Sequence, residues 1–469
     1  MKRMKKLFAI LMTMAMVMGL GITGFAATND SARITVQNAN DAELQYLQII
    51  APNRETRTGW AFINGAGTYF QQAFANSDEQ AIIDQLIANN NISEDLADAL
   101  SKVANNLTYE DMDNPQTVTS AGLYAIKATE SGYTYNNMTA YVGFAELEDY
   151  EYPALDDANV IAKKTPTTVT KTVTETGSDK VVQIGDIVTY QIETTVPYID
   201  PNADADSKKF YVYDDIGDGA EYYLTGAGST ATVTVGDETV ENPNFDTSKA
   251  TGHDLVIDLS SYITSDNANA GKKVVVTYTA QIVKVDNITN TAGSHFGGSD
   301  SDFKPVTALY TGEIILTKYN KNRTEELAGA EFNVKLQGTN VALTFDAAVD
   351  DNGMNVYTYN PKGSVTTLVT GSAGTLKVQG LDLGTYVFEE TKAPEGYSKS
   401  PTTASATLEL EEGESSASEL VTTNTEMLND KLASLPETGG MGTTLFTIAG
   451  CVIMISAAGL FFATRKKAN

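Results

Sequence analysis

Charged and amide side chains fall on the apolar faces of several expected strands. The alternation places five of them among apolar neighbours: Lys171 between Val169 and Val173, Asp214 after Phe210 and Val212, Asn290 between Ile288 and Ala292, Lys318 after Ile314 and Leu316, and Glu390 after Tyr386 and Phe388. Because successive side chains of a strand point to opposite faces, these groups are expected in a core, although a slip of one residue would expose all of them. Burying an unpaired charge is costly, so such groups call for a chemical reason.

A dry environment changes what a lysine and a carboxylic acid can do. Desolvation lowers the pKa of a buried lysine and raises that of a buried carboxyl group, each by as much as ~3–5 units. The amine is then neutral and nucleophilic, and the acid is protonated. Such an acid can hydrogen-bond a nearby carboxamide and move protons while the amine attacks it.

The two regions that carry these residues are predicted to be all-β. Apolar side chains alternate over residues 188–196 and again over 274–282, and clusters of Pro, Gly and Asp separate such runs. Residues 310–433 repeat this style. Short strands divided by frequent turns are typical of β-sandwiches, so a series of Ig-like sandwiches is predicted.

The first region, by contrast, mixes strands with helices. Its strand-like runs cover residues 32–37, 123–128 and 139–145. Ser77-Asp78-Glu79-Gln80 has the pattern of a capping box that opens one helix, and Ser93 is placed to cap a second helix that runs to about Val103. The region is therefore predicted to be α+β, with Trp60 in its core.

The composition excludes several classes of function. The chain has 469 residues with 60 acidic against 32 basic side chains, and its net charge of −28 argues against binding nucleic acid through a basic face. A single cysteine, Cys451, and two histidines, His253 and His295, leave no disulfide framework and too little for a zinc site. No metal or cofactor is expected, and no motif of a nucleophile or a phosphate loop marks an enzyme that acts on an external substrate.

Both ends have the pattern of targeting segments. Residues 1–26 combine a basic start, an apolar run and small residues, as in a secretory signal peptide that is cut after Ala26. At the other end, Leu435-Pro436-Glu437-Thr438-Gly439 precedes an uncharged stretch at 440–464 and the basic group Arg465-Lys466-Lys467. This stretch is long enough to span a bilayer, and the basic tail is expected to stay on the cytoplasmic side.

The C-terminal segment, residues 435–469, resembles the cell-wall sorting signal of Gram-positive surface proteins. The resemblance implies that a sortase cysteine cuts between Thr438 and Gly439 and holds the Thr438 carbonyl as a thioester, which an amine then attacks. The mature protein is expected to be exported and covalently attached to peptidoglycan.

Several pieces of the all-β regions resemble pilin domains that form isopeptide bonds. Residues 386–397 closely resemble the E-box region of CnaB-type pilin domains, and residues 315–318 with 327–332 resemble the opening of that domain. Residues 159–308 are similar to the fimbrial CnaA-type domain, through pieces at 170–173, 185–190, 213–215 and 289–292. The resemblance implies an N-terminal pilin domain at 27–158, a CnaA-like domain at 159–308 and a CnaB-like domain at 309–433.

The same resemblance implies autocatalytic isopeptide bonds inside these domains. Lysine Nζ would attack the asparagine Cγ with loss of ammonia, and an acid would catalyse the step. Asn429 shares its strand parity with Met427 and Val421, which favours it over Asn424 as the last-strand partner. The assigned sets are Lys171 with Asp214 and Asn290, and Lys318 with Glu390 and Asn429.

Shaft pilins of this family use a further lysine to join subunits, in a Tyr-Pro-Lys-Asn-like motif near the junction of the first two domains. The corresponding stretch is residues 160–166, where Ile161-Ala162 replaces the Tyr-Pro pair. Lys163 aligns with the family lysine and Lys164 is the alternative. A basic linker between domains would give the same pattern.

The predicted function is a major (shaft) pilin of a cell-wall fimbria that supports adhesion. A pilus-type (class C) sortase is expected to polymerise copies of the chain head to tail through Thr438 and a lysine near 163, and a housekeeping sortase to attach the fibre to peptidoglycan. Accessory tip or basal pilins are the other expected partners. The alternative is a monomeric wall-anchored adhesin or a minor pilin; the adhesin would lack only a working joining lysine.

Overall fold

The computed structural model describes residues 31–88, 94–144, 154–175, 177–350, 353–435 and 442–466. The expected signal peptide, Ser93 and residues 436–439 of the sorting signal lie outside the described residues. The chain divides into two compact units, the first formed by residues 1–312 with 379–383 and 409–421, and the second by the remainder. Strands dominate both units, so the predicted mainly β fold is confirmed.

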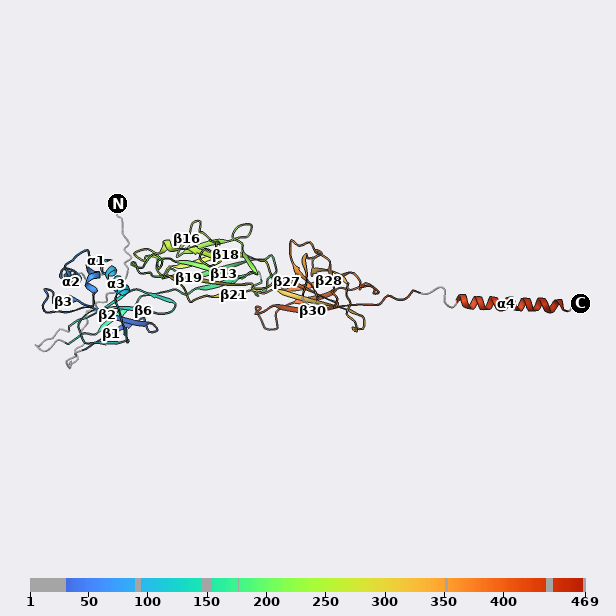
Figure 1. Ribbon diagram of the computed structural model, residues 1–469, viewed down its shortest axis with the longest axis horizontal. Coiled ribbons are helices and arrows are strands. Elements are labelled where there is room, and N and C mark those ends of the chain that lie inside the picture. The colour runs from blue at the N-terminus through green and yellow to red at the C-terminus, as the bar shows by residue number, and fades with distance from the viewer. Residues whose placement is uncertain are drawn as a thin grey trace. The chain divides into compact units, whose positions relative to one another are not determined.

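The N-terminal part of the first unit combines two main sheets, a separate two-stranded sheet and three helices (Figure 1). The larger sheet has the order β3 (Trp60–Phe62), β2 (Glu43–Pro52), β6 (Gly122–Thr129) and β8 (Met138–Val142), with β4 (Glu110–Met112) paired to β2. The smaller sheet has the order β5 (Gln116–Val118), β1 (Ala32–Gln37) and β9 (Ala158–Ile161). Helices α1 (Ala66–Ala73), α2 (Glu79–Ala88) and α3 (Glu94–Asn106) supply Phe70, Ile82 and Leu100 to a shared core.

The ends of the helices differ slightly from the prediction. Asp78 Oδ1 accepts hydrogen bonds from the first backbone N–H groups of α2 at 2.9 and 3.2 Å, so Asp78 rather than Ser77 caps this helix. Helix α3 continues to Asn106, beyond the predicted end near Val103. Trp60 is half-buried and packs at the edge of the core rather than inside it.

Residues 158–166 are tied into the N-terminal part by strand pairing. Strand β9 runs parallel to β1, and β10 (Lys164–Pro166) pairs antiparallel with β7 (Tyr133–Tyr135). The segment that carries Lys163 and Lys164 therefore has a fixed backbone on both sides and is not a loose linker.

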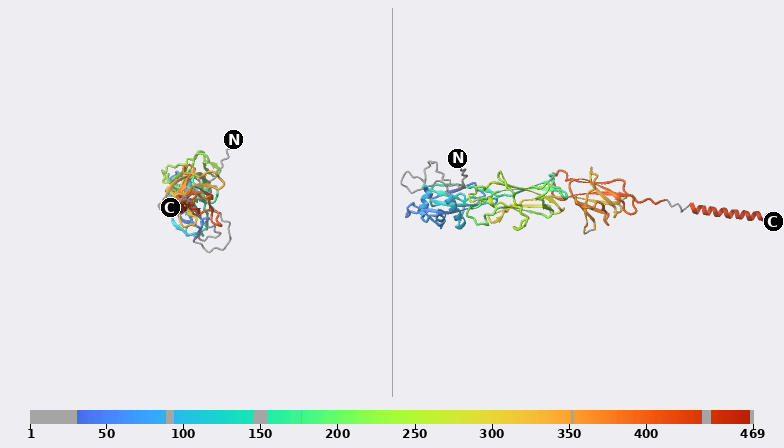
Figure 2. Two further views of the ribbon diagram at one scale, coloured as in Figure 1. Left: turned by 90° about the vertical axis from the view of Figure 1, so that its right-hand side faces the viewer. Right: turned by 90° about the horizontal axis from the view of Figure 1, so that it is seen from above.

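A β-sandwich follows within the first unit, and Figure 2 shows it from two further directions. One sheet has the order β11 (Thr170–Thr174), β12 (Ile187–Thr195), β18 (Lys273–Ile282), β15 (Ala231–Val235) and β16 (Glu238–Thr239), with β14 (Ala220–Tyr222) paired to β18. The other has the order β17 (Leu255–Asp258), β13 (Tyr211–Ile216), β19 (Thr289–Phe296) and β20 (Ser299–Asp300), with β21 (Val306–Ala308) paired to β19. The alternating residues of β12 and β18 face the core as predicted.

The second unit contains another two-sheet sandwich and a C-terminal helix. One sheet has the order β24 (Phe345–Val349), β25 (Asn355–Tyr359), β27 (Thr375–Leu381), β22 (Gly312–Asn320) and β30 (Val421–Asn429). The other has the order β26 (Leu368–Val369), β23 (Glu331–Leu336), β28 (Gly384–Lys392) and β29 (Ala404–Leu408). Helix α4 (Gly442–Arg465) is, among the described residues, the one helix long and apolar enough to cross a membrane, and it matches the predicted span.

Candidate cross-linking and sorting sites

The core of the C-terminal sandwich contains a lysine, a glutamate and an asparagine in mutual contact. Lys318 lies on β22, Glu390 on β28 and Asn429 on β30, and each is at most 2 % exposed. Lys318 Nζ contacts Asn429 Oδ1 and lies 3.2 Å from Glu390 Oε1. Asn429 Nδ2 donates to the same Glu390 oxygen at 2.8 Å. The acid therefore touches both the amine and the amide.

Burial sets the protonation of this lysine. Desolvation lowers the pKa of Lys318, and the nearby Glu390 carboxylate only partly opposes that effect. A backbone N–H, that of Ser400, donates to the second oxygen of Glu390 at 2.6 Å and fixes the carboxyl group. The result is an amine that loses its proton readily, held next to a carboxamide carbon.

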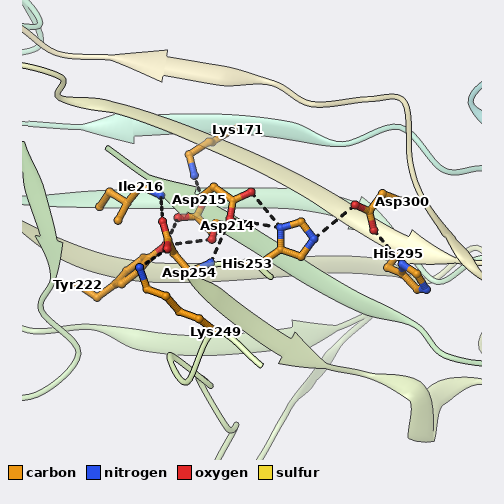
Figure 3. A network of polar contacts seen from close by, with 10 residues as sticks. All are labelled: Lys171, Asp214, Asp215, Ile216, Tyr222, Lys249, His253, Asp254, His295 and Asp300. Carbon is orange, nitrogen blue, oxygen red and sulfur yellow. Dashed lines mark hydrogen bonds and ion pairs between the residues drawn. The ribbon is translucent and has the colours of Figure 1, made fainter. Parts of the chain in front are cut away.

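The middle sandwich holds a second set, which Figure 3 shows in part. Lys171 on β11 contacts the carboxylate of Asp214 on β13, and both side chains are fully buried. Asn290, on β19, is 1 % exposed. Desolvation lowers the pKa of Lys171 and raises that of Asp214, and both shifts favour a neutral amine beside a protonated acid.

Two tyrosines complete this middle site, and the sequence analysis did not select either. The Tyr278 hydroxyl on β18 lies 2.9 Å from Lys171 Nζ and 2.9 Å from Asn290 Nδ2. The Tyr222 hydroxyl on β14 donates to Asp214 Oδ1 at 2.8 Å. The only sequence signal for Tyr278 was a hydroxyl on a face expected to be buried.

The two candidate joining lysines have different surroundings. Lys164 Nζ lies 3.0 Å from Glu130 Oε2 and 4.0 Å from the centre of the Tyr133 ring. The hydrogen bond with Glu130 raises the pKa of Lys164. Lys163 is half-buried, desolvation lowers its pKa, and its ammonium group has no hydrogen bond or ion pair within the part of the chain that the structure describes.

The sorting signal is described only in part. Leu435 is 87 % exposed at the end of the extended segment after β30. Pro436, Glu437, Thr438 and Gly439 lie outside the described residues, and α4 follows them.

The two histidines lie close together, because both contact Asp300. His253 Nδ1 lies 3.0 Å from Asp215 Oδ2, and His253 Nε2 lies 3.4 Å from Asp300 Oδ2. His295 Nδ1 lies 2.8 Å from the other oxygen of Asp300 (Figure 3). Each ring also stacks on a tyrosine of β13. Pairing of β13 with β17 and β19, and of β19 with β20, brings these residues together, which spacing along the chain cannot reveal.

Comparison with known proteins agrees with these features. Residues 312–425 match the family profile of the SpaA prealbumin-like fold domain, and residues 428–469 match that of the LPXTG cell wall anchor motif. No curated protein matches the chain. Among solved structures, the T6 backbone pilin of serotype M6 Streptococcus pyogenes superposes with a TM-score of 0.59 at 14% identity, over 87% of this chain and 100% of that one. The major pilin SpaA of Corynebacterium diphtheriae superposes with a TM-score of 0.49 at 14% identity, over 86% of this chain and 100% of that one.

The chain therefore has the fold of a Gram-positive backbone pilin and carries a cell-wall anchor. Residues 312–425 are similar to the SpaA prealbumin-like fold domain, and the anchor motif at the C-terminus attaches the protein to the cell wall.

Proposed function

We propose that this chain is the major subunit of a covalently polymerised pilus on a Gram-positive cell wall. The observation that carries the proposal is the pairing of an LPXTG anchor with a backbone-pilin fold that extends over 87% of the chain. A pilus-type sortase would cut after Thr438 and pass its carbonyl to an amine of the next subunit. A housekeeping sortase would attach the last subunit to peptidoglycan, and accessory pilins would occupy the tip or the base.

The amine that joins subunits is assigned to Lys163. A thioester is attacked by a neutral amine, and burial lowers the pKa of Lys163. Lys164, in contrast, is held by Glu130 and the Tyr133 ring, and its pKa is raised. The two neighbouring lysines would thus have different roles: Lys163 would attack the thioester, and Lys164 would hold β10 against β7.

Within each subunit, Lys171–Asn290 and Lys318–Asn429 bonds are proposed to form without an enzyme. The neutral Nζ attacks Cγ of the asparagine, a proton passes from Nζ to the leaving nitrogen, and ammonia departs. In the C-terminal domain Glu390 touches both nitrogens and would carry that proton. The cross-links would give a cysteine-poor extracellular protein the durability that disulfides give others.

An immunoblot of wall extracts boiled in detergent tests the proposed polymer. The wild type is expected to give a ladder of high-mass bands, and Thr438→Ala is expected to give monomer only, because no thioester forms at alanine in this motif. Glu437→Gln is the matched control: it occupies the variable position of the LPXTG motif and should keep the ladder. A single monomeric wall-linked band in the wild type, with its sortase expressed, would favour the anchored adhesin instead.

A further inference from the structure

The two proposed cross-linking sites differ in what connects amine to amide. In the C-terminal sandwich Glu390 contacts both Lys318 and Asn429. In the middle sandwich Asp214 contacts Lys171, but the hydrogen bond of the Asn290 amide goes to the Tyr278 hydroxyl, and Asn290 Oδ1 has no partner among the described residues. A phenol therefore stands where a carboxyl group stands in the other domain.

This inference rests on the Lys171–Asn290 bond proposed above. We propose that Tyr278 is a catalytic residue of that bond, whose hydroxyl passes a proton from the attacking Lys171 nitrogen to the departing Asn290 nitrogen. It lies 2.9 Å from each of these two reacting atoms.

The step balances without any further reactant. The lone pair of neutral Lys171 Nζ forms a bond to Asn290 Cγ, and the carbonyl electrons move onto Oδ1. Nζ gives one proton to the Tyr278 oxygen while the phenol gives its own proton to Nδ2. The carbonyl re-forms, the Cγ–Nδ2 bond breaks, ammonia leaves with both bonding electrons, and Tyr278 ends as it began. Asp214 keeps the proton that the lysine lost earlier.

The surroundings of Tyr278 suit such a relay. The residue is fully buried on β18, its ring lies 5.5 Å from that of Tyr190, and the ring of Tyr222 packs on it at 5.7 Å. Burial and the nearby Asp214 raise the pKa of Tyr278, so the hydroxyl releases its proton only as it receives another. Tyr222 holds Asp214 Oδ1 at 2.8 Å and leaves Oδ2 to the lysine.

The test measures both bonds in one chain. The full chain is made by cell-free synthesis, quenched in acid at intervals and digested, and the joined peptides of Lys171–Asn290 and Lys318–Asn429 are quantified by mass spectrometry. In Tyr278→Phe the first pair is expected to form at least about tenfold more slowly, while the second forms at the wild-type rate.

A matched control removes a different buried phenol hydroxyl. Tyr213 precedes Asp214 in the sequence, and its buried hydroxyl has no hydrogen-bond partner among the described residues. Tyr213→Phe should therefore form both cross-linked pairs at the wild-type rate. If Tyr278→Phe forms the middle pair at the wild-type rate, the relay is wrong and the cross-link proposal stands. If the wild type never forms that pair, the cross-link proposal itself fails in this domain.

Rapid tryptic digestion of the middle sandwich would show that Tyr278→Phe does not fold. In that case a fluorinated tyrosine at position 278 provides the test. Tyr278→3-fluorotyrosine keeps the ring and the hydroxyl but makes the hydroxyl more acidic. A change in the rate of the middle pair, with the C-terminal pair unaffected, supports proton transfer through the hydroxyl. An unchanged rate means that the ring only fills space, and overturns the proposal.

Discussion

Replacing Lys163 by arginine is expected to collapse the high-mass ladder of wall extracts to monomer. Arginine keeps the positive charge and nearly the length of the side chain, so the β9–β10 connection should keep its structure. Its guanidinium group remains charged at all accessible pH values and cannot attack a thioester. Because each junction in the fibre needs one amine, the loss of polymer should be complete rather than partial, as an immunoblot would show.

Lys164→Arg is the matched control. An arginine at this position can keep the contacts with Glu130 and with the Tyr133 ring, since guanidinium groups pair with carboxylates and stack on aromatic rings. The ladder should therefore persist. A ladder that is lost in Lys164→Arg and kept in Lys163→Arg would move the joining amine to Lys164, and one that survives both substitutions would place it elsewhere in the chain.

The burial of the candidate cross-linking residues could be predicted because strands have a period of two. Lys171, Asp214, Asn290, Lys318 and Glu390 all lie on the faces that the alternation assigned to the cores, and each is at most 9 % exposed. Apolar neighbours fix the register, since a slip would expose them as well. The chemical roles of these five residues remain predictions.

The role of Tyr278 could not be predicted in the same way. It stands in an alternating run with Val276 and Ala280, where a tyrosine that only fills the core gives the same pattern. What distinguishes it is that Lys171, 107 positions away on β11, and Asn290, on a strand of the opposite sheet, both reach its hydroxyl. The run around Tyr278 does not reveal this arrangement.

Long-range pairing also explains the surroundings of the joining lysines. The resemblance to pilin domains placed a domain boundary between residues 158 and 159. The β9 strand nevertheless pairs in parallel with β1, more than a hundred residues earlier, and β10 pairs with β7. A local pattern does not identify the partner strand of β9 or of β10. It therefore could not show that Glu130, 34 residues earlier, and Tyr133 hold Lys164.

Glu390→Gln is expected to remove the C-terminal cross-link while it keeps the shape of the side chain. Glutamine cannot take up and return a proton, so Lys318 and Asn429 should remain unjoined. The purified chain should then be about 17 Da heavier, the mass of one ammonia, than a Glu389→Gln chain, which has the same composition and keeps the bond. Glu389→Gln is the control, because Glu389 is adjacent, 46 % exposed and paired with Lys335 at 2.9 Å.

The same substitution should lower the melting temperature of the C-terminal domain by on the order of 20 °C. The bond would join residues 111 positions apart, and a cross-link that closes a loop of ~100 residues stabilises a fold by about 4.7 kcal/mol when it restricts the unfolded chain. Loss of the exposed Glu389–Lys335 pair removes at most ~1 kcal/mol, so Glu389→Gln should shift the melting temperature by only a few degrees. Calorimetry and tryptic digestion measure the difference. If Glu390→Gln has the same mass and melting temperature as Glu389→Gln, Glu390 does not catalyse a bond here. If Glu390→Gln is less stable but has the same mass as Glu389→Gln, the contacts among Lys318, Glu390 and Asn429 stabilise the core without a covalent bond.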